Sequence, residues 1–196
     1  MKIAVALVSV LGLWAVVASI EAHAKSGNDG SAVARLEQKL DHLEQNGQRA
    51  HPDPTPTILS EPEINAYIAS GRVQLPAGVE SLRLEGEPGV IEGTARVDFD
   101  QLKSGHNSAN PLLSIFSGVH DVVVSAQARG ADHVGMVHVD SVSLDGVAIP
   151  QFALQLFVDK YITPKYPDLG IDSRFVLPAK IETAVVGQHE VTLTQR

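Results

Sequence analysis

The chain has 196 residues, no cysteine and a formal net charge of −8 at pH 7. This length suffices for one domain with a substantial core and is short for two. The acidic balance opposes the phosphate contacts from which nucleic-acid-binding proteins gain affinity, so we expect no nucleic-acid partner. The absence of cysteine excludes disulfides, zinc sites with thiolate ligands, cysteine nucleophiles and lipid attachment at a cysteine.

The first 24 residues have the features of a secretory signal. Lys2 precedes an apolar run over residues 3–20, and Ala22 and Ala24 place small residues where a signal peptidase cleaves. We therefore expect an exported protein of the periplasm or cell envelope, without residues 1–24. The alternative is an uncleaved signal anchor, because the apolar run of 18 residues just reaches the length of a membrane-spanning helix.

Residues 25–57 form a polar segment that contains one short amphipathic helix. Over residues 31–46, apolar side chains recur at helical spacing at Val33, Leu36, Leu40 and Leu43. The three leucines make a heptad-like seam, which predicts either a weak homodimer or a helix that lies on the domain. Alternate prolines over residues 52–56 then predict an extended spacer, so we expect the globular domain to span residues 58–196.

The predicted domain opens with a helix and a hairpin. Ser60 to Glu63 have the sequence of a capping box with a proline in the first turn. One helix face is apolar until Gly71, with Ile64, Tyr67 and Ile68. From residue 73 onward, period-two alternation predicts a hairpin that reverses over residues 85–89.

A seven-residue sequence recurs 102 residues later in the chain. Residues 75–81 read Leu-Pro-Ala-Gly-Val-Glu-Ser and residues 177–183 read Leu-Pro-Ala-Lys-Ile-Glu-Thr, identical at four positions. Each copy follows a predicted helix and leads into a predicted hairpin, the second turning at residues 187–189. We interpret this repeat as an internal duplication, and coincidence is the alternative because Leu-Pro-Ala is a common sequence.

Between the two copies, alternation over residues 122–128 and 137–144 predicts adjacent antiparallel strands. Asp145 and Gly146 turn the chain, and Pro150 opens a helix whose broad apolar face comprises Phe152, Leu156, Phe157, Tyr161 and Ile162. About six or seven strands and two or three helices, without alternation of the two, predict an antiparallel α+β domain.

Residues 110–118 predict a short apolar helix between two strands. Asn110 caps it, Pro111 suits its first turn, and Gly118 ends it. Its apolar side chains are Leu112, Leu113, Ile115 and Phe116. Such a helix is either a lid over an apolar cavity, an insertion point into a membrane leaflet, or a plug at the end of the core.

No residue pattern supports catalysis. His133 and His138 have an odd spacing and would face opposite sides of one strand, so they do not predict a metal pair. His120 precedes Asp121 directly, but adjacency in the sequence does not orient an imidazole toward a carboxylate. The spacing of the aspartates also does not indicate a pair of carboxylates that could flank a glycosidic bond; these are Asp98, Asp100, Asp121, Asp140 and Asp145. We expect no enzymatic activity, no cofactor and no metal; a hydrolase with an unrecognised site is the alternative.

Three segments carry a resemblance to a known family: residues 60–65 at the start of the first helix, residues 139–150 with a strand, a turn and Ile149-Pro150 before a helix, and Leu177-Pro178 before the last hairpin. Together they resemble the LmeA-like phospholipid-binding proteins and, more distantly, the tubular lipid-binding domains of periplasmic lipoproteins. The resemblance implies a strongly curved antiparallel sheet wrapped around one long helix, with a further short helix. It also implies a groove between sheet and helix that holds acyl chains.

The implied function is binding of phospholipid or another apolar ligand, in lipid transport, with contact to a membrane surface. Such a groove needs no catalytic residue, because each buried methylene contributes roughly 0.8 kcal/mol. We expect it to be lined by Ile64, Tyr67, Ile68, Leu112, Leu113, Ile115, Phe116, Phe152, Leu156 and Phe157. The alternative is a non-enzymatic structural or interaction protein of the envelope that oligomerises through Leu36, Leu40 and Leu43.

Overall fold

The structure is a computed structural model that describes residues 29–103, 111–164 and 166–196. The predicted signal segment, residues 1–24, lies outside the described residues, and so does the predicted cap Asn110. Within the described ranges, no helix combines the length and the apolar character needed to cross a membrane.

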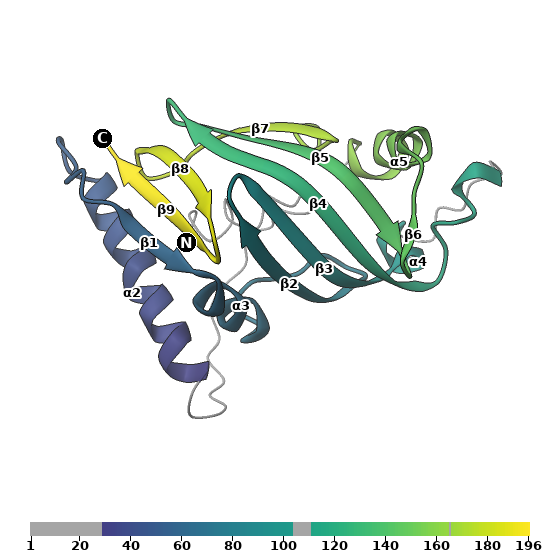
Figure 1. Ribbon diagram of the computed structural model, residues 1–196, viewed down its shortest axis with the longest axis horizontal. Helices are drawn as coiled ribbons and strands as arrows, with labels where there is room; N and C mark the ends of the chain where they lie inside the picture. Colours follow the sequence, from purple (N-terminus) through teal and green to yellow (C-terminus); the bar gives the residue numbers. More distant parts are fainter. Residues whose placement is uncertain (1–28, 104–110, 165) are drawn as a thin grey trace.

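One nine-stranded antiparallel sheet dominates the fold (Figure 1). Its order is β1–β9–β8–β4–β3–β2, and β5 pairs with β4, β6 and β7. The strands are β1 (Thr57–Ser60), β2 (Val79–Glu87), β3 (Val90–Asp98), β4 (Val119–Ala131), β5 (Val134–Leu144), β6 (Val147–Ala148), β7 (Asp172–Val176), β8 (Ile181–Gly187) and β9 (Glu190–Gln195). The antiparallel α+β class is confirmed, with more strands than the sequence predicted.

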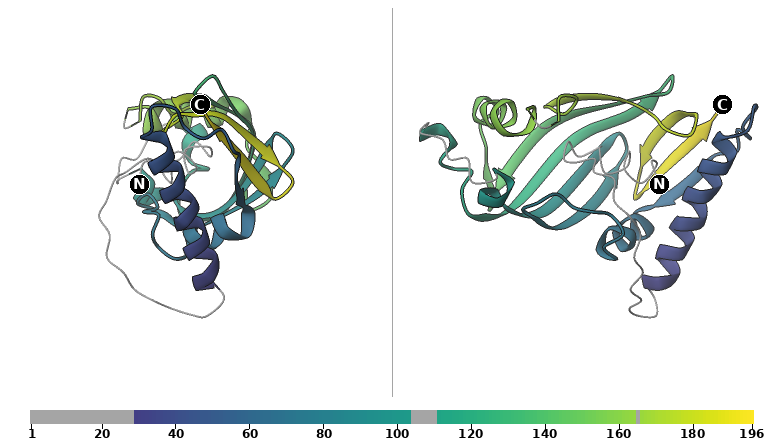
Figure 2. Two further views of the ribbon diagram at one scale, coloured as in Figure 1. Left: turned by 90° about the vertical axis from the view of Figure 1, so that its left-hand side faces the viewer. Right: turned by 180° about the vertical axis from the view of Figure 1, so that it is seen from behind.

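The helical elements lie at the two ends of the sheet. They are α2 (Asp29–Gly47), α3 (Glu61–Ala69), α4 (Phe99–Leu102), the 3-10 turn η1 (Pro111–Leu113), α5 (Gln151–Phe157) and the π-helical segment η2 (Val158–Ile162). The long helix α2 lies beside β1 and β9, whereas α5 lies at the opposite end, and the sheet curls between them (Figures 1 and 2). The expected sheet wrapped around one long helix is therefore not confirmed.

Helix α2 belongs to the folded domain. Leu36, Leu40 and Leu43 are only 2%, 8% and 0% exposed and are part of the same core as the sheet. Glu63 of α3, itself buried, forms ion pairs with Arg35 at 3.1 Å and Lys39 at 2.6 Å. The domain thus begins at α2 rather than at residue 58, and the chain's own core covers the leucine seam predicted for a homodimer.

The proline segment forms neither helix nor strand over residues 52–56, and it is fixed to the domain. Asn46, near the end of α2, donates to the Asp53 carbonyl at 2.9 Å and accepts from the Asp53 N–H at 2.8 Å. Residues 52–56 therefore lead from α2 into β1 along the domain and do not form a free spacer.

The predicted turns form because their residues tolerate positive φ. Asp132 and His133, between β4 and β5, have φ values of 52° and 63°, and Asp145 and Gly146, between β5 and β6, have 49° and 79°. Positive φ at both central residues is the type I′ geometry, which matches the twist of a hairpin. The turn at Asp145 and Gly146 is confirmed where the sequence placed it. The β4–β5 turn, expected across residues 130–132, lies at Asp132 and His133 because β4 continues to Ala131.

The repeated sequence occupies equivalent positions in two hairpins. The N–H of Val79 donates to the carbonyl of Pro76 at 2.9 Å, and the N–H of Ile181 donates to that of Pro178 at 3.0 Å. Both hairpins then shift register at their first strand residues. The equivalence supports a duplication of the hairpin, but not of a whole helix-plus-hairpin unit, because strand β7 rather than a helix precedes the second copy.

Candidate functional site: an apolar cavity

Small and β-branched side chains cover the inner face of the central strands. Alternation along β4 turns Val122, Val124, Ala126 and Ala128 to this face. A bulge shifts the pairing of β4 with β5 after Ser125, so that both Val139 and Val142 of β5 also face inward. The bulge thereby extends the apolar surface across two strands along their whole length.

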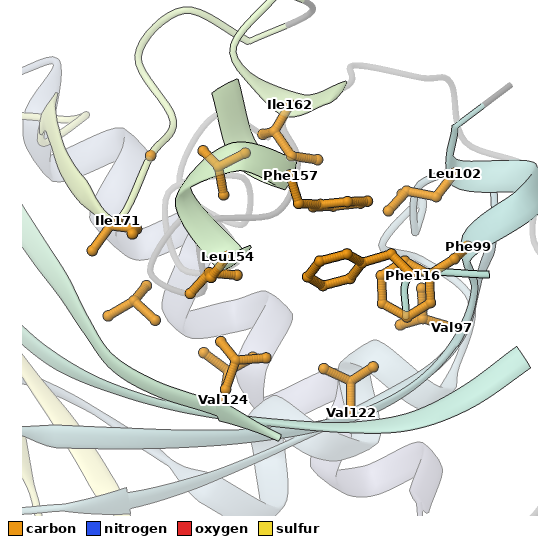
Figure 3. A pocket seen from close by; sticks show the side chains of 14 residues that line it. Val97, Phe99, Leu102, Phe116, Val122, Val124, Leu154, Phe157, Ile162 and Ile171 are labelled. Atoms are coloured by element: carbon orange, nitrogen blue, oxygen red, sulfur yellow. The ribbon is translucent and has the colours of Figure 1, made fainter. Parts of the chain in front are cut away.

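A cavity of about 90 Å³ lies between this face and the α5–η2 segment (Figure 3). It is lined by Val97, Phe99, Leu102, Phe116, Val122, Val124, Val139, Val142, Leu154, Phe157, Val158, Ile162, Gly170 and Ile171. None of these residues carries an ionisable or hydrogen-bonding side chain. The site can therefore bind an apolar group and has no means of its own for acid–base chemistry.

Three phenylalanines form one wall of the cavity. The ring centroids of Phe99 and Phe116 lie 5.6 Å apart, those of Phe99 and Phe157 5.5 Å, and those of Phe116 and Phe157 4.3 Å. The rings come from α4, from the segment after η1 and from α5, and Figure 3 shows them side by side. The cluster thus joins three chain segments at one end of the cavity.

A second, smaller apolar cavity lies on the same inner face, beneath the β8–β9 hairpin. Its volume is about 50 Å³, and Ala128 of β4 and Val137 of β5 line it. Val122, which lines the first cavity, is six residues from Ala128 along β4. At a rise of about 3.4 Å per residue, the two cavities follow one another along roughly 20 Å of apolar strand surface.

Among the predicted groove residues, Phe116 and Phe157 line the first cavity. Leu113 is buried in the core beside them. The predicted α3 residues do not line this cavity. Ile64 and Ile68 are buried in the core where α3 packs against α2 and β2, and Tyr67 packs against the same core. Asn65 of α3 fixes this position by two 2.8 Å hydrogen bonds with the backbone of Leu84 in β2.

Four further predicted residues are exposed and do not line the cavity: Leu112, Ile115, Phe152 and Leu156, which are 48%, 40%, 60% and 38% exposed. On α5, the exposure of Phe152 and Leu156 follows from the face of the helix on which they lie. Phe152 and Leu156 are four residues apart on the outer face, whereas Ala153 and Phe157 occupy the buried face. The helix is apolar on both faces, so its sequence does not reveal which face contacts the sheet.

Five of the lining residues belong to β3, β4 and β5 and were not predicted: Val97, Val122, Val124, Val139 and Val142. The alternation that predicted the strands could have identified these residues, because every second residue of an alternating run faces inward. A strand pattern identifies an apolar face, but it does not show whether other side chains fill the space in front of that face.

The π-helical segment η2 contains a buried hydroxyl group. Tyr161 is 6% exposed and its ring centroid lies 5.2 Å from that of Phe157. Among the described residues, its hydroxyl is the buried side-chain group that lacks a hydrogen-bond partner. Such a group costs about 1–3 kcal/mol, and π-helical turns occur frequently at functional sites. The segment that covers the cavity thus combines a π-helical turn with a buried hydroxyl that lacks a partner among the described residues.

The histidines make contacts between elements. His120 bonds Asp145 at 2.6 Å and the carbonyl of Ser117 at 2.8 Å, and His138 bonds Asp172 at 2.7 Å. These hydrogen bonds raise the pKa of both histidines. In the part of the chain that the structure describes, no three His, Asp or Glu side chains are grouped closely enough to hold a metal ion.

Comparison of the chain with protein-family models, with curated proteins and with solved structures finds no match in any of the three. The resemblance to LmeA-like proteins therefore stays a prediction. The geometry and chemistry of the cavity are what support a function.

Proposed function

We propose that the protein binds an acyl chain, or a similarly linear apolar ligand, between the sheet and α5–η2, and that it serves lipid binding or transport in the cell envelope. The observation that carries this proposal is the wholly apolar lining of the cavity. A chain that buries ten methylenes would gain roughly 8 kcal/mol before the cost of ordering it is subtracted.

The ligand must enlarge the cavity. Its volume of about 90 Å³ is below the roughly 300–1,000 Å³ of most small-molecule pockets. The α5–η2 segment is the wall that can move, because it has a π-helical turn and an unsatisfied Tyr161 hydroxyl. Outward movement of this segment would also expose the inner face of β4 toward the second cavity, which favours an elongated ligand.

The direct test is native mass spectrometry of the protein purified from a bacterial periplasm, followed by lipid extraction of the same sample. We expect a co-purifying lipid at about one molecule per chain. Val124→Phe places a large ring in the cavity and should abolish this occupancy. Val123→Phe makes the same change on the opposite face of β4 and should preserve it.

Thermal melting establishes that each variant is folded, and Val158→Phe on η2 provides a second way to fill the cavity if Val124→Phe does not fold. An unliganded mass for the wild type would contradict the proposal. Equal occupancy in the cavity-filling variants and in Val123→Phe would show that the ligand binds elsewhere.

A further inference from the structure

Exposed apolar side chains gather at one end of the molecule. Among the described residues, nine large apolar side chains are exposed, and six of them lie on η1, the segment after it, the start of β4, β6 and α5: Leu112, Ile115, Val119, Val147, Phe152 and Leu156. We call these six residues the apolar tip; their elements form the end opposite α2 in Figure 1. Exposed apolar side chains that gather in one region of a surface indicate an interaction site.

His120 and Asp145 join two of the segments that form the tip. Both ring nitrogens of His120 face acceptors, the Asp145 carboxylate and the Ser117 carbonyl, so the ring donates two hydrogen bonds as an imidazolium. This connects the segment after η1 with the β5–β6 turn. The N–H of Asp121 also donates to Asp145 at 2.9 Å. The segments that carry Ile115, Val119 and Val147 are therefore connected to one another.

The tip covers the outside of the cavity wall. Ile115 is exposed and the next residue, Phe116, is buried in the wall. Leu156 and Phe157 have the same relationship on α5. The same two chain segments thus present one side chain to the outer surface and the next to the cavity.

We propose that the apolar tip inserts into the headgroup and upper acyl region of a lipid bilayer. The tip projects from the end of the molecule on several separate elements, a shape that a bilayer accommodates without a matching recess. Part of this inference rests on the proposed function, because a lipid ligand has to be exchanged with a membrane.

The charges around the tip specify the kind of membrane. Asp100, Asp121 and Asp145 have side chains that are 59%, 65% and 56% exposed. The side chain of Lys103 is only 6% exposed and is paired with Asp100. Asp121 is likewise paired with Arg96, and Asp145 with His120. The border of the tip therefore carries little net charge, so anionic headgroups are not required. The attraction to the bilayer should be apolar, and a zwitterionic surface should suffice.

The test is co-sedimentation of the full protein with phosphatidylcholine vesicles. Leu112→Asp combined with Phe152→Asp should weaken binding roughly tenfold or more. Val176→Asp combined with Val185→Asp is the matched control, since these exposed valines lie on β7 and β8, away from the tip, and should leave binding unchanged. Binding of the wild type should persist in 1 M salt, where electrostatic attraction is screened.

The ligand content of the same samples separates this inference from the proposed function. A tip variant that keeps its lipid but no longer sediments with vesicles supports a membrane-binding tip. Wild-type protein that carries lipid but does not bind phosphatidylcholine vesicles overturns the tip proposal alone and points to a protein partner. Binding that requires anionic lipid and is lost in salt also overturns the tip proposal. Vesicle binding by a protein that carries no co-purifying lipid contradicts only the proposed binding of a lipid in the cavity.

Discussion

The side-chain amide of Asn46 in α2 donates to that of Gln195 in β9 at 2.8 Å, across a separation of 149 residues. Both side chains are buried, at 1% and 2% exposure. Gln195 in turn donates to the carbonyls of Leu43 at 2.7 Å and Ala179 at 2.5 Å. The last strand and the N-terminal helix are thus joined by a buried polar network whose donors and acceptors are matched.

Asn46→Ala should destabilise the domain strongly. It leaves the backbone groups of Asp53 and the side-chain oxygen of Gln195 without their partner. Because each unsatisfied buried polar group costs about 1–3 kcal/mol, we expect the free energy of unfolding to fall by about 2–4 kcal/mol. Urea denaturation measures this change, with the exposed Gln45→Ala in the same helix as the control. A change as small as the control's would refute the role of the network.

The ion pairs of Glu63 should make stability depend on acidity. Burial would raise the pKa of Glu63, but hydrogen bonds from Lys39, Ser60 and Arg35 outweigh burial and lower this pKa to about 2. The unfolded pKa is 4.5, so the ionised carboxylate stabilises the fold above that pH, and this contribution is lost as the pH falls from 4.5 toward 2. The loss should amount to about 3 kcal/mol.

Unfolding free energies measured at intervals between pH 7 and pH 2 test this expectation. Glu63→Gln should be less stable at pH 7 and should vary less with pH than the wild type. Glu92→Gln, on an exposed position of β3, should follow the wild-type profile. Parallel profiles for the wild type and Glu63→Gln would show that other carboxylates govern the acid response.

The contact of His120 with Asp145 should weaken in alkaline solution. The hydrogen bonds to Asp145 and to the Ser117 carbonyl raise the pKa of His120. A raised pKa means that the charged ring stabilises the fold fully below the ordinary value near 6.5 and loses this contribution as the pH rises through the folded value. Proton NMR titration should give a folded pKa above 6.5 that falls in Asp145→Asn; an unchanged titration curve in that variant would exclude the contact.

Gly47 should tolerate no side chain, although it ends a helix. A Cβ atom at this position would overlap the backbone carbonyl of Ala179, and the backbone cannot move aside without displacing the start of β8. We expect Gly47→Ala to lower the free energy of unfolding by about 2 kcal/mol or more. Gly30→Ala makes the same change near the start of α2 in open space and should be neutral or slightly stabilising. Equal melting temperatures for the two variants would disprove the close approach.

Local signals in the sequence predicted the parts of the fold that local physics determines. Alternation predicted β4 and β5, Asp145 and Gly146 predicted the turn after β5, and the Ser60 capping sequence predicted the start of α3. Strands β1 and β7 were missed because they span four and five residues, too few to show a period. Their positions depend on pairing with β9 and β5, which lie far away in the sequence.

The candidate site was predicted less well, because an apolar helix face does not identify its neighbour. Ile64 and Ile68 are as apolar as Phe157, yet they pack beneath α2, while Phe157 faces the cavity. Phe152 is apolar and faces outward. Only the arrangement of distant elements distinguishes a core residue, a cavity residue and an exposed residue of the same chemical type.

The packing of α2 limits how far the domain reaches from an N-terminal anchor. The proline segment lies after α2 and is bonded to the domain, so it adds no length to such a tether. Between an anchor over residues 3–20 and the start of α2 at Asp29, residues 21–28 span at most about 27 Å when fully extended. A protein that keeps its signal segment would therefore stay within this distance of one membrane, whereas cleavage would release a protein that can diffuse between two membranes.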